Sequence, residues 1–227
     1  MILQPGYIPW LGFFDMVYKS EALVFHTDLQ YDKGSWRNRN RIRTKEGWCW
    51  LTVPVLLKGH SYDRILDIKI DNSKKWRQRH RNLIRENYQG SSYFGDYFEP
   101  LIDILNKDWT YLMDLDLEII SWLLEEIGIQ RKIMYSHDLV LTGTRKTMRL
   151  ISICKQLGAD AYLSGSRGRN YIQDDMFKKE GIKLEYHDYV HPEYKQHFEG
   201  FVPYMSIIDL LFNEGKKSLP IIKEQCK

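Results

Sequence analysis

A chain of 227 residues with 43% hydrophobic residues is long enough to bury a sizeable core, which excludes a disordered protein. The formal net charge is +3, and no apolar run reaches the roughly 18 residues that span a bilayer. The N-terminus lacks the basic and apolar regions of a secretion signal, so the sequence predicts a cytoplasmic protein. Cys49, Cys154 and Cys226 are isolated, which predicts neither disulfides nor a zinc site.

The first predicted elements are a short strand, a stiffened loop and a helix start within residues 2–14. Pro5 and Pro9 restrict φ and push their predecessors toward extended geometry, whereas Gly6 and Gly12 let the backbone approach a partner closely. Open α/β folds bind ligands at this kind of connection, and a plain tight turn is the competing interpretation. The candidate ligand-binding residues in this loop are Gln4, Tyr7 and Trp10.

A second apolar strand, predicted over residues 21–30, ends in polar groups. His26 and Asp28 share one face of this strand, so they form a candidate imidazole–carboxylate pair for general-base catalysis. His80, on the apolar side of a later helix, is a further catalytic candidate. A core histidine that bonds to the backbone is the favoured alternative for His80.

Positive charge concentrates between Lys33 and Arg85, where 15 Lys and Arg residues stand against 4 Asp and Glu residues. Four arginines alternate from Arg37 to Arg43, and a period of two places them on one face of a strand. Such a stripe suits a phosphorylated small molecule, a nucleic-acid backbone or the acidic C-terminal half of the chain. A solvated edge strand protected by its charges is the structural alternative. The candidate binding residues are Arg37, Asn38, Arg39 and Asn40.

The middle of the chain is predicted to add two strands and then a helical portion over approximately residues 73–127. The strands are expected at residues 48–56 and 64–70. Apolar positions at 3,4 spacing predict helices at residues 73–88, 96–106, 116–127 and 144–157. Cys154 lies on the apolar stripe of the last helix, which favours packing over a nucleophilic role.

The second half of the chain alternates strands and helices. Strands are predicted at residues 159–164 and 182–189, and helices at residues 171–179 and 206–212. This alternation predicts an α/β fold with a mainly parallel sheet flanked by helices and with a helical insertion. We expect residues 1–227 to form a single domain.

The loop Ser164–Tyr171 is the second candidate ligand-binding segment. Glycines, serines and arginines between a buried strand and a helix offer N–H groups, hydroxyls and cations to a phosphate or carboxylate. An ordinary glycine-rich turn is the competing interpretation. Because this loop and the loop Gln4–Gly12 each join a strand to a helix, we expect them within reach of one another at one end of the sheet. The candidate binding residues are Ser164, Gly165, Ser166, Arg169 and Tyr171.

Several signatures of known chemistry do not occur. The loop Ser164–Tyr171 matches neither a Walker A loop nor a GxGxxG fingerprint, and it lacks the Gly-x-Ser-x-Gly order of a nucleophile elbow. His187 and His191 are four residues apart, but Pro192 argues against a helical metal pair. The sequence therefore predicts no metal, and it assigns no cofactor.

Six motifs are spread along the chain. They are Gln4-Pro5-x-Tyr7-x-Pro9-Trp10-x-Gly12, Arg37-Asn38-Arg39-Asn40, Trp50-Leu51-Thr52-Val53-Pro54, Tyr162-Leu163-Ser164-Gly165, His191-Pro192-x-Tyr194-x-Gln196 and Ser206-x-x-Asp209-Leu210-Leu211-x-Asn213-x-Gly215. Together they resemble the WbqC-like protein family over nearly the whole chain. Members of that family occur in bacterial O-antigen and other surface-polysaccharide gene clusters, and attachment of glycine or another acyl group to an amino sugar has been proposed for some. The fifth motif adds His191 to the candidate binding residues.

The layout of the first elements also resembles that of the nucleotidylyltransferases. Both have a strand, a Pro-containing loop, a helix and a second apolar strand in this order. Those enzymes carry a His-x-Gly-His motif at the helix start, which this chain lacks. Phosphate contacts would then come from Arg37, Arg39 or Arg169.

The resemblance to the WbqC-like family implies a transferase of surface-polysaccharide biosynthesis, and the two loops and the arginines are the features that such an enzyme would use. It would attach glycine or a similar acyl group to the amine of an amino sugar on a nucleotide or lipid-phosphate carrier. Such a reaction requires a base, for which we predict His26 with Asp28, and donors for the oxyanion, for which we predict Asn38, Asn40 and amides near Gly165. The acyl donor is unknown, with an aminoacyl-tRNA and an activated amino acid as candidates. The alternatives are a non-catalytic sugar-nucleotide-binding or scaffolding protein, and an RNA-binding module with aminoacyl-tRNA as partner.

Overall fold

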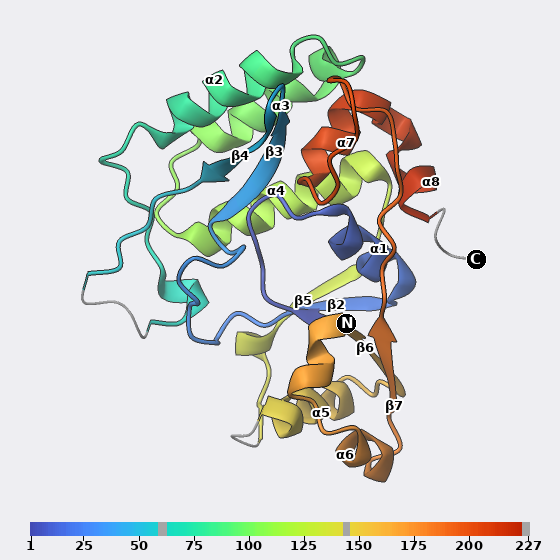
Figure 1. The fold of residues 1–227 in the computed structure, drawn as a ribbon. Coiled ribbons are helices and arrows are strands. Elements are labelled where there is room, and N and C mark those ends of the chain that lie inside the picture. The colour runs from blue at the N-terminus through green and yellow to red at the C-terminus, as the bar shows by residue number, and fades with distance from the viewer. Residues whose placement is uncertain (59–62, 143–145, 224–227) are drawn as a thin grey trace.

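The computed structural model describes residues 1–58, 63–142 and 146–223 (Figure 1). The strands are β1 (Ile2–Leu3), β2 (Ala22–Phe25), β3 (Arg39–Thr44), β4 (Gly47–Thr52), β5 (Lys132–Tyr135), β6 (Ala161–Gly165) and β7 (Lys183–His187). The helices are α1 (Leu11–Lys19), α2 (Trp76–Tyr88), α3 (Phe94–Asn106), α4 (Leu112–Ile127), α5 (Lys146–Gln156), α6 (Asp174–Lys179), α7 (Ile207–Glu214) and α8 (Ser218–Lys223). The helix start expected at Thr144 lies outside the described residues, as does Cys226.

Parallel pairing dominates the centre of the molecule. β2 pairs in parallel with β1 on one side and with β5 on the other, and β6 pairs in parallel with β7. β6 also contacts β1, so the two parallel groups meet there. The prediction of an α/β fold with a mainly parallel sheet flanked by helices is confirmed.

Helices cover both faces of these parallel strands. On one face, Ile2 and Val24 pack with the apolar sides of α5 and α6. On the other face, Leu23 and Phe25 pack with α1 and the large core beyond it. Figure 1 shows this arrangement, with α5 and α6 on the opposite side of β2 from α1. Since α1 follows β1 and α6 follows β6, the chain leaves these two neighbouring strands toward opposite faces, which makes their junction a topological switch point.

An antiparallel ribbon and a group of helices extend the α1 side of the molecule. β3 pairs with β4, and Ile42 and Leu51 on one face of this ribbon are buried in the core. α2, α3 and α4 occupy the portion that was expected to be helical, and α3 packs against both of them and against α7. In the described part of the chain, no helix has the length and apolar character needed to cross a membrane.

The strand predicted at residues 64–70 is wrong. Ile65–Asp67 form a 3₁₀ helix, and only isolated bridges flank it, from Arg64, Lys69 and Ile70 to three different partners. The buried residues Ile65, Ile68 and Ile70 are spaced by three and then two positions, so this segment follows neither a strand nor a helix period. Sequence patterns also missed β5 and α8.

Asp209, in the last of the six motifs, joins α7 to its surroundings. Its side chain is fully buried and accepts hydrogen bonds from the hydroxyls of Tyr88 and Tyr194 and from Nε2 of Gln196, at 2.7–2.8 Å. Burial raises the pKa of this carboxyl, and the three donors oppose that effect. Through Asp209, the motif therefore connects α7 to α2 and to the irregular segment before α7 by buried hydrogen bonds.

Candidate functional site

A cavity of about 470 Å³ opens at the carboxyl ends of the parallel strands. Leu3, Gly165 and His187, the last residues of β1, β6 and β7, all line it. The cavity thus lies at the switch point between β1 and β6, where open α/β sheets bind ligands. The loops Gln4–Gly12 and Ser164–Tyr171 both contribute to its wall, as predicted.

The loop Gln4–Gly12 is held in a strained shape beside the cavity. The backbone N–H of Tyr7 donates to the carbonyls of Trp36 and Arg37, and Nδ2 of Asn40 donates to the carbonyl of Ile8 at 2.8 Å. These bonds keep Ile8 at a φ of +42°, which is unfavourable for a β-branched residue. Strain of this kind persists where the surroundings determine the backbone closely, which is common at ligand sites.

Gly12 allows the ring of Trp10 to fold over the start of α1. A Cβ atom at residue 12 would lie 2.4 Å from that ring, so any larger residue would displace it. α1 begins without a capping side chain and has no acidic residue in its first turn. The N–H of Phe13 donates to the carbonyl of Trp10 at 3.0 Å, which leaves the N–H groups of Leu11 and Gly12 for an anion or a developing negative charge in the cavity.

His187 is paired with a buried carboxylate. Its Nε2 lies 2.5 Å from Oδ2 of Asp15, which projects from α1. Burial raises the pKa of Asp15, but hydrogen bonds from His187 and Lys19 outweigh this effect and hold the pKa below its usual value. The carboxylate of Asp15 accepts a hydrogen bond from the Nε2–H group of His187. The lone pair of Nδ1 is then available, because Nδ1 has no partner within the described ranges. A histidine that a carboxylate orients in this way is suited to act as a general base.

Three arginines of the described chain line the same cavity. Arg37 donates through Nη1 to two backbone carbonyls of the first loop, both at 2.6 Å, and its Nε is buried without a described partner. Arg41 donates to the carbonyl of Tyr204 at 3.1 Å, and its Nε is also buried and unpaired among the described residues. Arg167 forms no ion pair with any residue that the structure describes. Guanidinium groups with unused N–H donors are suited to bind phosphate oxygens.

Aromatic rings form another part of the wall. The ring of Trp10 contacts Tyr189 with a centroid distance of 5.4 Å and Tyr204 with a centroid distance of 5.8 Å. Tyr204 has a φ of +62°, a second strained backbone position at this cavity. His191 stacks on Trp10 at 6.4 Å and does not line the cavity, so it supports the ring wall.

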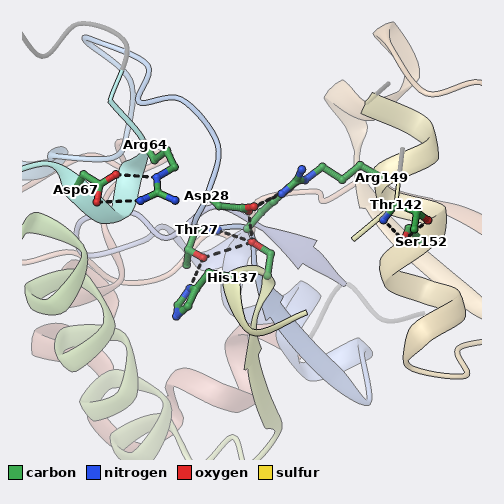
Figure 2. A network of polar contacts seen from close by, with 10 residues as sticks. Thr27, Asp28, Arg64, Asp67, His137, Thr142, Arg149 and Ser152 are labelled. Atoms are coloured by element: carbon green, nitrogen blue, oxygen red, sulfur yellow. Dashed lines mark hydrogen bonds and ion pairs between the residues drawn. The ribbon is translucent and has the colours of Figure 1, made fainter. Parts of the chain in front are cut away.

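The structure places His26 and Asp28 in a separate polar network with Arg149. Figure 2 shows Asp28 beside Arg149 in this network. Arg149 reaches from α5, donates through Nε to Nε2 of His26 at 2.9 Å and forms an ion pair with Asp28, which also accepts from Ser136. Burial, with the charge of Arg149 adding to it, lowers the pKa of His26 to about 4. The neutral ring then carries its proton on Nδ1, while the lone pair of Nε2 is engaged by Arg149. Base catalysis by His26 stays a prediction, and it requires Arg149 to move.

His80 connects the first loop to the ribbon. Its Nε2–H donates a hydrogen bond to the carbonyl of Thr52 at 3.1 Å, because a carbonyl oxygen can only accept. Nδ1 therefore accepts a hydrogen bond from the hydroxyl of Tyr7 at 2.8 Å. Burial lowers the pKa of His80 to about 4, so this neutral tautomer persists at physiological pH. In this position His80 supports Tyr7, and neither residue lines the cavity.

The remaining predicted binding residues divide into two groups. Those that line the cavity are Gln4, Trp10, Arg37, Asn40, Gly165 and Ser166. Those that lie outside its lining are Tyr7, Asn38, Arg39, Ser164, Arg169, Tyr171 and His191. Among the latter, Arg169 forms an ion pair with Asp188 at 2.6 Å, and the guanidinium of Arg39 stacks on Trp50 at 4.4 Å.

The expected stripe of four arginines on one strand face is wrong. β3 begins at Arg39, so Arg37 precedes the strand and turns into the cavity. Arg43 is buried and donates to the carbonyls of Thr44, Gly47, Glu199 and Gly200. Much of the local positive charge therefore binds the protein's own carbonyl groups.

Two other features were weighed as sites. A surface depression of about 610 Å³ lies at the opposite end of the parallel strands, between the end of α1 and the start of β5. Its Arg131 already donates to the carbonyls of Tyr18 and Ser20. The depression lies at the amino ends of β2 and β5, whereas open α/β sheets bind ligands at the carboxyl ends of their strands. Within the described ranges, no group of three or more His, Cys, Asp or Glu side chains is placed to hold a metal ion.

Sequence reasoning did not select Asp15, His187, Arg41 or Arg167 as site residues. The usable signals were a lone carboxylate within the apolar helix segment Leu11–Lys19 and a histidine at the end of the last predicted strand. Neither signal identifies its partner, because the two residues are 172 positions apart.

A family model and a known protein both match this chain over almost its full length. The model of the WbqC-like protein family matches residues 4–221. The uncharacterized protein Rv1507c of Mycobacterium tuberculosis (strain ATCC 25618 / H37Rv) is 36% identical over 219 residues, which cover 96% of this chain and 94% of that protein. No solved structure matches the chain significantly. The extent of the family match shows that this chain belongs to the WbqC-like protein family.

Proposed function

We propose that this protein transfers glycine or a similar acyl group to the amine of an amino sugar during surface-polysaccharide biosynthesis. The sugar would be linked to a nucleotide or lipid-phosphate carrier. The observation that carries the proposal is the combination, in one cavity, of the His187–Asp15 pair with Arg37, Arg41 and Arg167. A base and a phosphate-binding region are the two parts that such a reaction needs.

The arginines support a phosphorylated carrier. A carrier diphosphate brings several acceptor oxygens and negative charge, and the guanidinium groups of Arg37 and Arg41 line the cavity. Arg167 adds a charge from the opposite loop. A neutral ligand would leave these positive charges without a counter-charge in the cavity.

His187 is the base in this proposal. Its Nδ1 takes a proton from the sugar amine as the nitrogen attacks the acyl carbonyl of an activated donor. Asp15 stabilises the imidazolium that forms, and the same histidine then returns the proton to the leaving group. Backbone N–H groups of the first turn of α1 and of the loop at Gly165 are the proposed donors to the tetrahedral oxyanion.

The test compares two histidine variants in a transfer assay read by mass spectrometry. Candidate glycyl donors are supplied with nucleotide-linked and lipid-linked amino sugars. We expect His187→Asn to lower turnover by roughly 10²- to 10⁴-fold with substrate binding retained, as is usual when a general base is removed. His26→Gln is the matched control and should keep most of the activity.

Each outcome assigns a role. Loss of turnover in His26→Gln with normal turnover in His187→Asn would transfer the role of base to His26. Normal turnover in both variants would exclude both His187 and His26 as the base. Binding of the amino sugar without any transfer, across all donors, would favour the non-catalytic binding protein.

RNA binding is the competing proposal, and the basic segment Lys33–Arg85 is its basis. Arg43 and Arg77 weaken it, because both direct their guanidinium groups to backbone carbonyls of the protein. An RNA surface that used most of this segment should lose affinity steeply with salt, with a slope of about −0.7 per phosphate contacted. A slope near about −5 for tRNA, without measurable binding of a nucleotide sugar, would support the RNA-binding module.

A further inference from the structure

The rim of the cavity carries an exposed indole that the proposed chemistry does not use. Trp36 lines the cavity, and 38% of its surface is exposed. Its backbone carbonyl accepts the N–H of Tyr7 at 3.2 Å, which secures the first loop. The ring takes no part in that bond. A substitution of the side chain leaves this hydrogen bond in place, and it removes the contacts of the ring with Arg41 and with the ring of Trp50, whose centroid lies 5.2 Å away.

The ring of Trp36 contacts Arg41, one of the arginines that line the cavity. The guanidinium carbon of Arg41 lies 5.3 Å from the centre of the Trp36 ring and 5.0 Å from that of Trp48. Trp48 is also exposed, by 43%, but it does not line the cavity. Two indoles thus flank the same arginine, and only one of them is within reach of a ligand in the cavity.

The two classes of carrier differ in what they would place against this rim. A nucleotide presents a planar base, which stacks on aromatic rings and on guanidinium groups. A lipid phosphate presents a hydrocarbon chain, which requires a continuous apolar surface. The rim at Trp36, Arg41 and Tyr204 is aromatic and cationic, so it fits the planar base.

We propose that the carrier is a nucleoside diphosphate, with its phosphates on Arg37, Arg41 and Arg167 and its base stacked on Trp36. This inference rests on the proposed function for the amino sugar, and it adds the class of carrier and the residue that recognises it. The sugar then extends from the phosphates toward His187.

Titration calorimetry with nucleoside diphosphates tests this assignment. The probes are UDP, ADP, GDP and CDP, with inorganic pyrophosphate as the probe that lacks a base. We expect at least one nucleoside diphosphate to bind more tightly than pyrophosphate. Trp36→Ala should weaken that nucleotide by about 10- to 100-fold, the range for loss of one stacked base, and leave pyrophosphate binding unchanged. Trp48→Ala is the matched control and should leave both affinities unchanged.

Further variants separate recognition from folding. Trp36→Phe should restore most of the nucleotide affinity because it keeps an aromatic face. Arg167→Ala should weaken nucleotide and pyrophosphate alike. Equal binding of nucleotide and pyrophosphate by the wild type, equal losses in Trp36→Ala and Trp48→Ala, or no nucleotide binding at all would each overturn the inference.

The outcomes also distinguish this inference from the proposed function. Acyl transfer to a lipid-linked amino sugar, with no binding of any nucleoside diphosphate, would overturn the carrier and leave the transfer reaction standing. Nucleotide binding that depends on Trp36, with no transfer from any donor, would support the carrier and overturn the reaction.

Discussion

Asp116 is a buried acid on α4 with one oxygen unpaired. Its side chain is 1% exposed, and Oδ1 has no hydrogen-bond partner among the described residues. Burial raises the pKa of this carboxyl well above its usual value, and the charge of Arg37 only partly opposes that rise. The folded protein therefore binds a proton at Asp116 more tightly than the unfolded chain does.

This proton makes Asp116→Asn a stabilising substitution. Because the folded state binds the proton more tightly, the contribution of Asp116 to stability falls as pH rises above about 4. Asparagine has a similar shape and no charge to bury. Urea denaturation at pH 7 should give a free energy of unfolding higher by about 1–3 kcal/mol in the variant, and a smaller difference near pH 4. A less stable variant at pH 7 would mean that attraction between Asp116 and Arg37 outweighs the burial of the charge.

Residue types at strand ends were predictable, but their pairing was not. Gln4, Trp10, Gly165 and Ser166 were selected because they follow predicted strands, and all four line the cavity. His26 also lies at the end of a predicted strand, but its Nε2 accepts a hydrogen bond from Arg149. Position along a strand predicts the end of the sheet at which a side chain lies. It does not show which long side chain from a helix will reach that side chain first.

The helices and strands show where the spacing of apolar residues is sufficient to predict an element. Helices with a sustained 3,4 pattern, such as α2 and α3, were predicted within a few residues of their observed bounds. β5 was missed because its Lys132–Tyr135 stretch is too short to alternate clearly, and pairing with β2 stabilises it. At residues 64–70, tertiary contacts to three different partners replaced the strand that local pattern favoured.

Arg43 joins two elements, so its loss should affect both. It is buried on β3 and donates to carbonyls of the β3–β4 turn and of residues 199–200, the irregular segment that leads to Tyr204. Arg43→Met leaves these carbonyls without a donor. We expect the free energy of unfolding to fall by about 2–4 kcal/mol, as for loss of several charged hydrogen bonds in a buried site.

Arg39→Met on the same strand is the control for this substitution. Arg39 contacts Trp50 and one carbonyl at the surface, so its replacement should cost less than about 1 kcal/mol. The two variants are compared by urea denaturation at one pH. Equal losses would show that Arg43 does not tie the segment to the ribbon.

At the scale of the whole molecule, two neutral histidines predict how the protein responds to acid. His26 supports the sheet against α5, and His80 supports the first loop against α2 and the ribbon. Burial lowers the pKa of each to about 4, against about 6.5 in an unfolded chain. The unfolded chain therefore binds more protons between pH 6.5 and 4, and stability falls as pH falls through this window.

The expected loss is large enough to measure. Each histidine contributes up to about 3 kcal/mol over this range, and the carboxylates with lowered pKa, such as Asp15 and Asp28, act only below it. Asp116 and Asp209, whose pKa values burial raises, oppose this loss over the same pH range, so the histidine contribution is read from the difference between wild type and variant. Urea denaturation of wild type and His26→Asn at pH 7, 5.5 and 4 should show that the free energy of unfolding of the wild type falls relative to that of the variant as the pH falls. A difference between the two proteins that stays constant from pH 7 to pH 4 would contradict the burial of the neutral His26 ring.

The cavity takes its walls from both ends of the chain, which has a consequence for the timing of its formation during synthesis. Residues 3–16 and 36–41 leave the ribosome well before the other lining residues, which are residues 165–167, His187, Tyr189 and Tyr204. A growing chain can begin to pack β1, β2 and α1 long before it can hold a ligand. A product that stops before residue 204 would lack part of the wall, so premature termination should yield a protein without binding activity.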